Sequence, residues 1–525
     1  MKAGPTHCRG DILREENGMV LFIILFLMVM LTFLGLSGLM TATTDIQISK
    51  NYHSSTQALN LAEAGLEQAM ADLIADLGDD QDISNSNFYR TDGSTLTITA
   101  SSTAFYDVFS SSLGNGTYTV AFKNVGTSPN FSAGEIFVRS TGLINDNSQK
   151  VIESYLATEN VNPWNNAIFA NGGGGTIPLN GNVNVGGSVH ILGNGLNACD
   201  GSPSTDDTAV YVQTGNIFNG HDNGGGNTID NTLDNYINYT GWNSNNLNAK
   251  LRVKKGCVDM QVGSGEVGIS SNAVKGIYVG NGDDSDSNGV NDDIVGGDNE
   301  GAGQNLYSRN RTTEGYDLGG VNVPFPTIDT TWLNANSLDM NTCGFGTDDL
   351  QLTSATNDFG PCQNVTNGRT NSIQWDKASK TLTISGIIKM DKIDIEADIN
   401  YSGKGTLYST NTGTTPSEAV QLEGNILPAT TGSYPTTHVI GIIATGDIAF
   451  DKAGLIATGA FYSAQTITPK KQTEVAGTLV CNKFDLGSQV PKVWQVITLA
   501  SNLPPGMPGS NYIWVFTTRR WREVF

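Results

Sequence analysis

Side chains that commonly carry out catalytic chemistry are scattered in this sequence. The five histidines are widely spaced, and none belongs to an HExxH helix or a similar metal-binding pattern: His7, His53, His190, His221 and His438. No G-x-S-x-G elbow is present, and the glycine run at 172–175 lacks the Gly-Lys-Ser/Thr end of a phosphate-binding loop. The sequence therefore predicts that the protein is not an enzyme.

One group of carboxylates leaves an enzymatic alternative open. Asp391, Asp394, Glu396 and Asp398 could supply the acids of a glycosidase or a polysaccharide lyase. Their alternation with apolar residues explains them equally well as the outer face of a strand. We favour the strand interpretation.

The segment 284–292 is rich in side-chain oxygens at alternate positions. It is similar to the calcium loops of thrombospondin type 3 and EF-hand-like repeats, in which glycine at position 6 permits the turn. That similarity implies these calcium ligands: Asp284, Asp286, Asn288, the carbonyl of Val290, and Asp292. Position 12 is Val295, so Asp283 or Asp293 would have to replace the usual bidentate carboxylate. A plain solvated loop is the alternative.

Six cysteines suggest disulfides rather than a zinc site. Cys8 lies ahead of the apolar segment described below, and the other five lack the short paired spacings of a zinc ribbon. An oxidising compartment with one or two disulfides is the better interpretation. Cys199 with Cys257 and Cys343 with Cys362 are candidate pairs, although the sequence leaves the connectivity open and one thiol over.

The composition favours β structure and an acidic surface. The 525 residues are 38% hydrophobic and 15% charged, with 62 glycines, which fits turn-dense β structure better than a helical enzyme. The formal net charge of −22 repels phosphate backbones. We therefore expect no nucleic-acid partner.

An apolar segment near the start can span a membrane. Residues 19–40 carry no charge, and their length of about 22 residues gives a helix of ~33 Å, enough for a ~30 Å hydrocarbon core. The flank Glu15-Glu16-Asn17-Gly18 is unlike that of a secretory signal, and no small-residue cleavage site follows the run. An uncleaved signal anchor is the plainest interpretation of such a segment.

The helical pattern continues beyond the apolar segment. Between residues 45 and 77, apolar residues recur at three- and four-residue steps, with Asn60, Glu63, Glu67 and Asp72 off the stripe. The stripe comprises Ala58, Leu59, Leu61, Ala62, Leu66, Ala69, Met70, Leu73, Ile74 and Leu77. We expect one long helix, half in lipid and half packed on a soluble domain.

These features together resemble the amino-terminal region of PilX-type minor pilins. The resemblance rests on a short leader ending in Gly18, an apolar helix starting at Met19, and the stretch LAEAGLE at 61–67. It covers roughly residues 10–77. It implies that a prepilin peptidase cuts between Gly18 and Met19 and methylates the new terminus, and that the helix then packs in the core of a type IV pilus.

One residue departs from the usual pilin pattern. Most pilins have glutamate at the fifth mature position, where this chain has Ile23. An unpaired buried charge is costly, so a subunit without that acid fits a place at the tip or in initiation of the filament. The K-type pseudopilins of type II secretion systems share this absence and are one alternative. A membrane-anchored adhesin outside any filament is another.

The resemblance also implies partners and a location. The partners would be major and minor pilins, the prepilin peptidase, the inner-membrane assembly platform and a surface or host ligand. The chain would lie in the bacterial inner membrane as a single-pass protein, and then outside the cell in the pilus, where it would serve adhesion or interaction.

The remainder of the chain predicts an α+β protein with two kinds of β structure. Period-two segments within 79–160 indicate a pilin-like antiparallel sheet. Very short strands with Asn-Gly and Gly-Gly turns at 161–196 and 376–498 suggest a β-solenoid, because Gly441–Phe450 aligns with Gly454–Ser463 at an offset of 13. A β-sandwich is the alternative.

The predicted boundaries divide the chain into six parts. They are a leader at 1–18, a pilin helix at 19–78 with 19–40 in the membrane, the sheet region at 79–160, the solenoid-like domain at 161–196 and 376–498, a polar insertion with the candidate calcium loop at 197–375, and a tail at 499–525.

Overall fold

The structure is a computed structural model of the chain. It describes residues 12–79, 88–96, 104–124, 135–172, 177–197, 199, 204–212, 215–224, 227–260, 265–280, 294–298, 303–309, 313–318, 323–344, 348–414, 418–469, 472–485, 490–511 and 513–524. The chain forms two compact units, which we describe separately. The helix-and-sheet unit comprises Met1–Glu159 and Phe516–Phe525, and the parallel-strand unit comprises Asn160–Val515.

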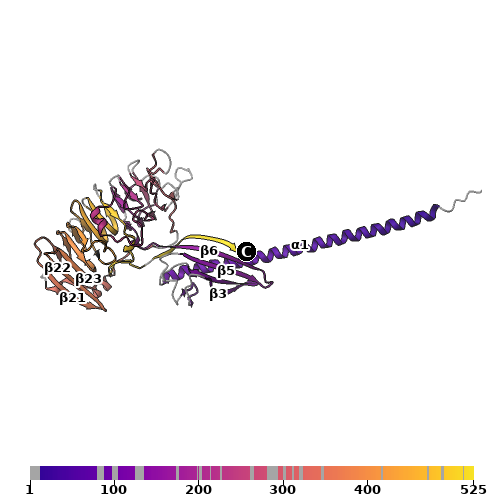
Figure 1. Ribbon diagram of the computed structural model, residues 1–525, viewed down its shortest axis with the longest axis horizontal. Coiled ribbons are helices and arrows are strands. Elements are labelled where there is room, and N and C mark those ends of the chain that lie inside the picture. The colour runs from indigo at the N-terminus through magenta and orange to yellow at the C-terminus, as the bar shows by residue number, and fades with distance from the viewer. Residues whose placement is uncertain are drawn as a thin grey trace, which may run out of the picture. The chain divides into compact units, whose positions relative to one another are not determined.

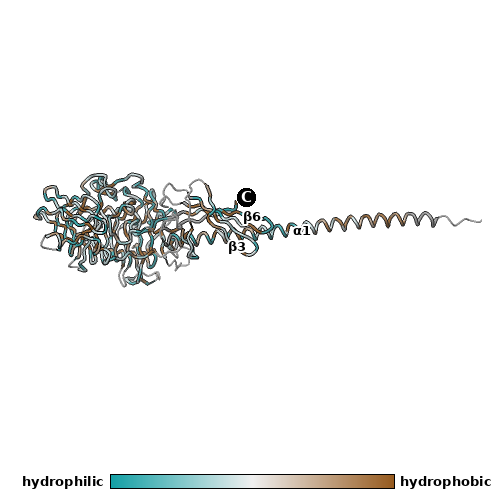
Figure 2. The backbone as a smooth tube through the Cα atoms, turned by 90° about the horizontal axis from the view of Figure 1, so that it is seen from below, coloured by the Kyte–Doolittle hydropathy of each residue, from teal (hydrophilic) through white to brown (hydrophobic). Residues whose placement is uncertain are grey.

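A single long helix, α1 (Ile12–Asp79), dominates the helix-and-sheet unit (Figure 1). It continues from the apolar segment into the amphipathic segment without a break at Gly35 or Gly38. The apolar residues gather in the first part of the helix (Figure 2). The expected single helix is confirmed, and it begins earlier than Met19.

An antiparallel sheet packs against the second part of α1. Its strand order is β3-β4-β5-β6-β34, and neighbours from β3 to β6 are antiparallel. The bounds are β3 (Tyr106–Leu113), β4 (Gly116–Asn124), β5 (Glu135–Ile144), β6 (Gln149–Asn160) and β34 (Trp514–Val524). A small hairpin, β1 (Phe88–Tyr89) with β2 (Thr95–Leu96), covers the end of the helix. The predicted meander is present.

The last strand of this sheet comes from the far end of the sequence. The chain leaves along β6, forms the whole parallel-strand unit, and returns as β34 beside β6. Arg522 on β34 donates to Glu153 on β6 at 2.9 Å, and Arg139 on β5 donates to the same carboxylate at 2.6 Å. The segment expected as a tail therefore contains a structural strand, and Arg522 on it is paired with Glu153 while 77% of its side chain stays exposed.

The parallel-strand unit consists of short strands stacked in parallel in three columns. The first column runs β19-β23-β26-β29-β31-β32-β7-β10-β13-β16-β18, the second β20-β24-β27-β30-β31-β32-β8-β11-β14-β17, and the third β23-β25-β28-β31-β32-β33-β9-β12-β15. The strands β23, β31 and β32 are long enough to contribute to more than one column.

The strand bounds of this unit fall into two runs of sequence. The first run contains β7 (Ile168–Ala170), β8 (Leu179–Gly181), β9 (Asn184–Gly186), β10 (Val189–Ile191), β11 (Thr208–Val212), β12 (Asn216–Phe218), β13 (Lys250–Val253), β14 (Cys257–Asp259), β15 (Glu266–Val267), β16 (Gly276–Val279), β17 (Ile294–Val295) and β18 (Thr313–Glu314). The second contains β19 (Leu338–Asp339), β20 (Leu350–Leu352), β21 (Phe359–Thr366), β22 (Arg369–Asp376), β23 (Thr381–Met390), β24 (Ile393–Ile395), β25 (Ile399–Ser402), β26 (Lys404–Ser409), β27 (Val420–Leu422), β28 (Ile426–Pro428), β29 (Val439–Ala444), β30 (Ile448–Phe450), β31 (Leu455–Pro469), β32 (Thr473–Asp485) and β33 (Lys492–Trp494).

The two runs meet in the middle of the stack. The first run starts there and proceeds to one end, and the second starts at the opposite end and proceeds back until β32 and β33 pair with β7, β8 and β9. A buried ladder of aliphatic and aromatic residues crosses the junction. In order, it is Leu338, Ile388, Leu407, Ile442, Phe461, Leu479, Ile168, Val189, Leu251 and Ile277.

The interval between stacked residues differs from the offset of 13 found in the sequence. Gly441 stacks on Ala460, and Gly459 on Gly477, so successive turns lie 19 and 18 residues apart rather than 13. The offset of 13 aligns Ile442 in the first column with Leu455 in the third. The similarity arises because all three columns bury the same kinds of residue. The strands at 208–314, within the predicted polar insertion, also belong to these columns.

Short helices and one hairpin complete the parallel-strand unit. The hairpin β21–β22 is antiparallel and joins β23 (Figure 1). The helices are α2 (Asn231–Tyr236), α3 (Thr330–Asn336) and the 3-10 turns η2 (Pro163–Asn165), η4 (Met340–Cys343) and η5 (Ile497–Leu499). Leu333 on α3 is buried.

A buried histidine makes the stability of this unit sensitive to acid. The exposed fraction of His221 is 2%, and its Nε2 lies 2.8 Å from the Gln495 carbonyl oxygen. Burial lowers the pKa of His221 from 6.5 to about 4, against the opposing effects of the Gln495 carbonyl and Asp234. The unfolded chain then binds the proton more tightly than the folded chain.

We therefore expect the free energy of unfolding to fall by about 3 kcal/mol as the pH drops from about 6.5 to about 4. Guanidinium unfolding across this pH range measures it on the detergent-solubilised chain. The variant His221→Gln should lose this part of the slope, whereas His53→Gln, at an exposed site on α1, should keep it. An unchanged slope in His221→Gln would contradict the assignment.

Candidate functional site

The first part of α1 exposes an apolar surface that no other described element covers. Large apolar side chains from Met19 to Met40 are 44% to 69% exposed, with Ile23 at 49%. An 18-residue window of this helix has a mean hydropathy of 3.0. Burying apolar area gains roughly 25 cal/mol per Å², so such a surface needs lipid or the helices of other subunits around it. The segment can act as a membrane span.

The predicted processing residues lie within this helix. Gly18 and Met19 are both helical, so α1 passes through the predicted cut without a turn. Downstream of that position, residues 19–40 contain no acidic side chain, in keeping with Ile23 at the fifth place.

The second part of α1 packs on the sheet through small residues. Ala58, Ala62 and Ala69 are fully buried, and Gly65 approaches Tyr118 and Ser140 so closely that a Cβ atom would overlap them. On the sheet side, a Cβ atom at Gly142 would lie 2.6 Å from the amide nitrogen of Ala62 and overlap the carbonyl oxygen of Ala58. The LAEAGLE stretch thus allows backbone-to-backbone approach, while Glu63 and Glu67 stay exposed.

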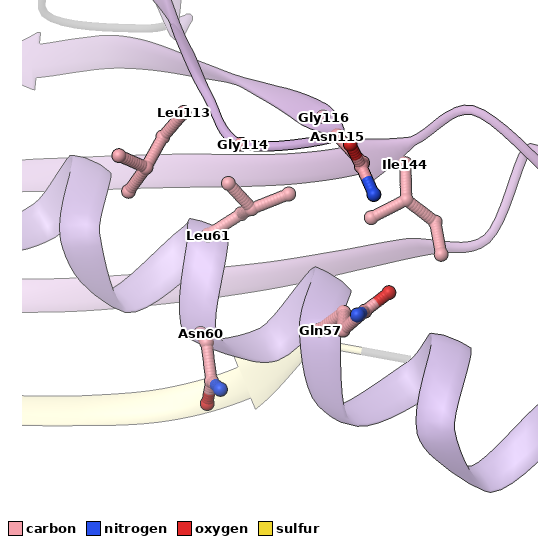
Figure 3. A pocket seen from close by; sticks show the side chains of 8 residues that line it. All are labelled: Gln57, Asn60, Leu61, Leu113, Gly114, Asn115, Gly116 and Ile144. Carbon is pink, nitrogen blue, oxygen red and sulfur yellow. The ribbon is translucent and has the colours of Figure 1, made fainter.

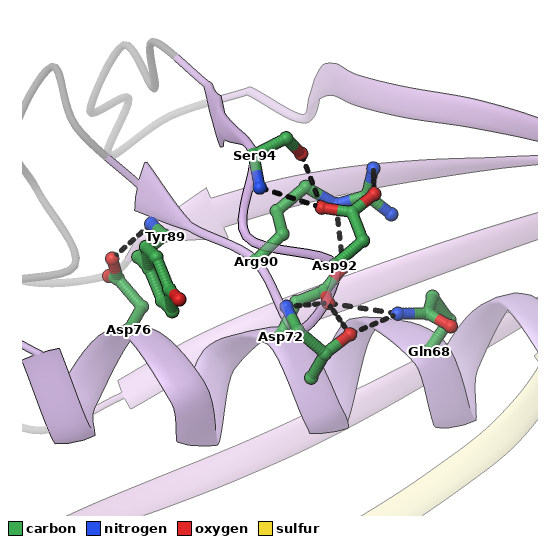
Figure 4. A network of polar contacts seen from close by, with 8 residues as sticks. Gln68, Asp72, Asp76, Tyr89, Arg90, Asp92 and Ser94 are labelled. Atoms are coloured by element: carbon green, nitrogen blue, oxygen red, sulfur yellow. Dashed lines mark hydrogen bonds and ion pairs between the residues drawn. The ribbon is translucent and has the colours of Figure 1, made fainter.

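A buried carboxylate joins the end of α1 to the small hairpin (Figure 4). Asp72 is fully buried and accepts hydrogen bonds from Arg90 Nε at 2.8 Å, the Thr91 amide at 3.1 Å and Gln68 Nε2 at 2.8 Å. One turn later, Asp76 accepts from the Tyr89 amide at 2.6 Å. Asp72 was expected on the polar side of the helix, whereas it faces the hairpin, and Ile74 of the predicted stripe is exposed.

A groove lies between α1 and the β3–β4 turn (Figure 3). Its volume is about 320 Å³. Leu61 and Ile144 form part of its wall, Leu113 is 54% exposed beside it, and Gln57 and Asn60 supply amides from the helix. This mixed apolar and amide lining suits contact with another polypeptide better than chemistry on a small substrate.

The structure describes the candidate disulfide residues but not the candidate calcium loop. The calcium loop at 284–292 lies outside the described residues. Among the residues that are described, no group of three or more His, Cys, Asp or Glu side chains could hold a metal ion. Cys199 is joined to Cys257 and Cys343 to Cys362 by disulfides, and Cys481 is a buried free thiol.

The carboxylates considered for catalysis have different surroundings. Asp394 on β24 has its pKa raised by burial and by Glu396 and Glu423. Asp398 pairs with Lys452 at 3.1 Å, and its pKa is lowered because the Asn425 amide and Lys452 outweigh burial. Asp391 accepts from the Asn411 side chain at 3.1 Å through its own carboxylate. These contacts are those of strand and turn residues.

An apolar helix docked through small residues on an antiparallel sheet defines a pilin-like fold, here interrupted by a large β-rich unit. Among solved structures, the chain is similar to the competence-associated pilin ComZ from Thermus thermophilus, with a TM-score of 0.51 over 90% of this chain and 98% of that chain. The two sequences are 19% identical, so the likeness concerns the fold. No protein-family model and no curated protein matches the chain.

Proposed function

We propose that this chain is a minor pilin of a type IV pilus, assembled through α1 and located at the tip or in initiation of the filament. The observation that carries the proposal is α1 itself. Its first part exposes apolar residues that require lipid or neighbouring helices, and its second part is fixed to the sheet by Ala58, Ala62 and Gly65. One helix thus suits both a membrane-stored and a filament-packed subunit.

The details of processing and assembly follow the PilX-type resemblance. A prepilin peptidase would cut between Gly18 and Met19 and methylate Met19, and the assembly platform in the inner membrane would deliver the subunit to other pilins. Ile23 supports a terminal place, because a subunit that lacks the acid cannot neutralise the amino terminus of a neighbour.

The parallel-strand unit would be a β-solenoid displayed outside the cell for adhesion or interaction. The continuous parallel register of its three columns supports this proposal, as do the buried ladders inside it. Calcium bound by Asp284, Asp286, Asn288, Val290 and Asp292 would order one of its loops, which calorimetric titration with Ca²⁺ would test by the presence or absence of binding heat.

Processing provides the decisive experiment. In a bacterium with its own type IV pili, the tagged full chain is expected to yield a mature protein starting at N-methylated Met19, and to be recovered with sheared filaments. Gly18→Val should block both steps, because the peptidase requires a small residue there. Gly10→Val, in the same leader, serves as the matched control and should leave both steps intact.

Two other results of these experiments would favour an adhesin or a pseudopilin instead of a minor pilin. A start anywhere but Met19, measured by mass spectrometry, would refute the pilin proposal and leave a membrane-anchored adhesin. Correct processing with normal piliation but lost protein export in a deletion strain would indicate a K-type pseudopilin of a type II secretion system.

The likeness to a competence-associated pilin favours one further role. The shared fold extends over 90% of this chain, a share large enough to include most of the parallel-strand unit. A competence-associated subunit would reduce transformation when deleted while the number of pili stays normal. The net charge of −22 disfavours direct contact with DNA in that role.

A further inference from the structure

A pocket in the parallel-strand unit combines an exposed indole with an arginine that has no carboxylate partner among the described residues. The Trp332 pocket, as we name it, has a volume of about 610 Å³. Its lining comprises Thr327, Asp329, Trp332, Leu333, Arg369 and the loop 503–511. Trp332 is 40% exposed, although most large apolar side chains of this unit are buried.

Two adjoining elements fix the arginine over the indole. Arg369 follows the Asn367-Gly368 turn of the β21–β22 hairpin, and Asn367 donates to the Asn336 side chain on α3 at 2.9 Å. Asn336 in turn donates to the Trp332 carbonyl at 2.8 Å. The guanidinium carbon of Arg369 lies 5.4 Å from the centre of the Trp332 ring. The pair is therefore preorganised.

Arg369 is half-buried, and one nitrogen of its guanidinium lacks a hydrogen-bond partner. Nη1 of Arg369 is buried without a hydrogen bond, and no carboxylate pairs with Arg369 within the part of the chain that the structure describes. A buried donor of this kind destabilises the folded protein when it is unsatisfied, and more so when it is charged. A ligand oxygen can approach Arg369 through the part of its side chain that lines the pocket, since Nη1 itself has no accessible surface.

A proline-rich loop supplies a further part of the lining. Pro504, Pro505 and Pro508 lie in the loop 503–511. The loop is held in place because Trp164 donates to the Pro508 carbonyl at 2.8 Å and Thr406 donates to the Pro505 carbonyl at 2.6 Å. These two carbonyls are thus engaged, and among the three prolines Pro505 is half-buried while Pro504 and Pro508 are buried.

The charges of the pocket favour an uncharged ligand. Asp329, whose carboxylate accepts from the Trp332 amide at 2.9 Å, stands in the same pocket as Arg369. An anion would meet Asp329 and a protein with a net charge of −22, and a cation would meet Arg369. A ring with one apolar face and several hydroxyl groups suits the indole, the carboxylate and the guanidinium together. Its apolar face can stack on Trp332, and its hydroxyl groups can donate to Asp329 and accept from Arg369.

We propose that the Trp332 pocket binds a neutral pyranose unit of a glycan. This inference goes beyond the proposed function and does not depend on filament assembly, since binding is a property of the purified chain. Trp332 would stack on the sugar ring, Arg369 would donate to a hydroxyl or ring oxygen, and Asp329 would accept from a hydroxyl.

Saturation-transfer NMR and tryptophan fluorescence on the detergent-solubilised full chain test the proposal. The probes are the methyl glycosides of glucose, galactose and mannose, and N-acetylglucosamine, with glucuronate and inorganic phosphate as anionic comparisons. We expect at least one neutral sugar to bind, and Trp332→Ala and Arg369→Gln each to weaken it by about 10-fold or more. Trp521→Ala, which removes another exposed indole, should leave binding unchanged.

A variant of Asp329 tests the third contact of the sugar. Asp329→Asn preserves the cap of α3, because asparagine caps as well as aspartate, and it should weaken the neutral sugar without loss of fold. The proposal is overturned if no neutral sugar binds, if binding survives Trp332→Ala, or if glucuronate or phosphate binds more tightly than every neutral sugar.

Discussion

Replacing Gly142 with valine is expected to reduce the free energy of unfolding of the helix-and-sheet unit by about 3 kcal/mol or more. The added Cβ atom would overlap the carbonyl oxygen of Ala58 and lie 2.6 Å from the amide nitrogen of Ala62. Both are backbone atoms of α1, so no side-chain rotation relieves the clash. The helix has to move away from β5, which also exposes the face formed by Ala58 and Ala62.

Hydrogen exchange followed by mass spectrometry measures this effect locally. Peptides covering residues 54–73 and β4 should lose protection in Gly142→Val, while peptides from the parallel-strand unit should not. Leu143→Ala is the matched control, because its side chain is 40% exposed on the neighbouring position of the same strand. Equal protection in Gly142→Val and the wild type would refute the close-packed docking of α1.

Replacing Leu479 with alanine is expected to destabilise the parallel-strand unit by about 3 kcal/mol. Leu479 is 1% exposed and lies between Phe461 and Ile168 in the buried ladder, at the point where the two runs of strands meet. Truncation leaves a cavity at this junction, because the strands on each side are held by their own backbone ladders and cannot collapse into it.

Chemical unfolding monitored by tryptophan fluorescence measures the loss. As the control, Val365→Ala removes a smaller amount of hydrocarbon from a residue that is 73% exposed on β21, and it should change the free energy of unfolding by no more than about 0.5 kcal/mol. A loss in Leu479→Ala as small as that of the control would contradict the continuity of the ladder.

Features governed by local pattern could be predicted from the sequence. The apolar run and the three- and four-residue stripe predict α1, and period-two segments predict the antiparallel strands β4, β5 and β6, because both signals depend on neighbouring residues only. The turn-rich texture around Gly181 and Gly187 likewise predicts short strands.

Features governed by distant partners could not be predicted. The sequence pattern predicts that Asp72 lies on the polar face of the helix. It does not reveal that Arg90 and the Thr91 amide satisfy the carboxylate of Asp72. The stacking interval of 18 or 19 residues is hidden by similar apolar content in all three columns. Arg369 and Trp332 become neighbours only through the Asn367–Asn336 contact, so no signal in the linear sequence marks their pocket.

The junction of the two strand runs has a consequence for biosynthesis. Because synthesis proceeds from the amino terminus, β7, β8 and β9 emerge long before their partners β32 and β33, and one side of the first run stays open until residue 494 has left the ribosome. Open strand edges invite pairing with other chains. The nascent first run is therefore open to pairing with other chains until β32 and β33 are made, and a premature stop shortly before β32 would leave it without its closing neighbour.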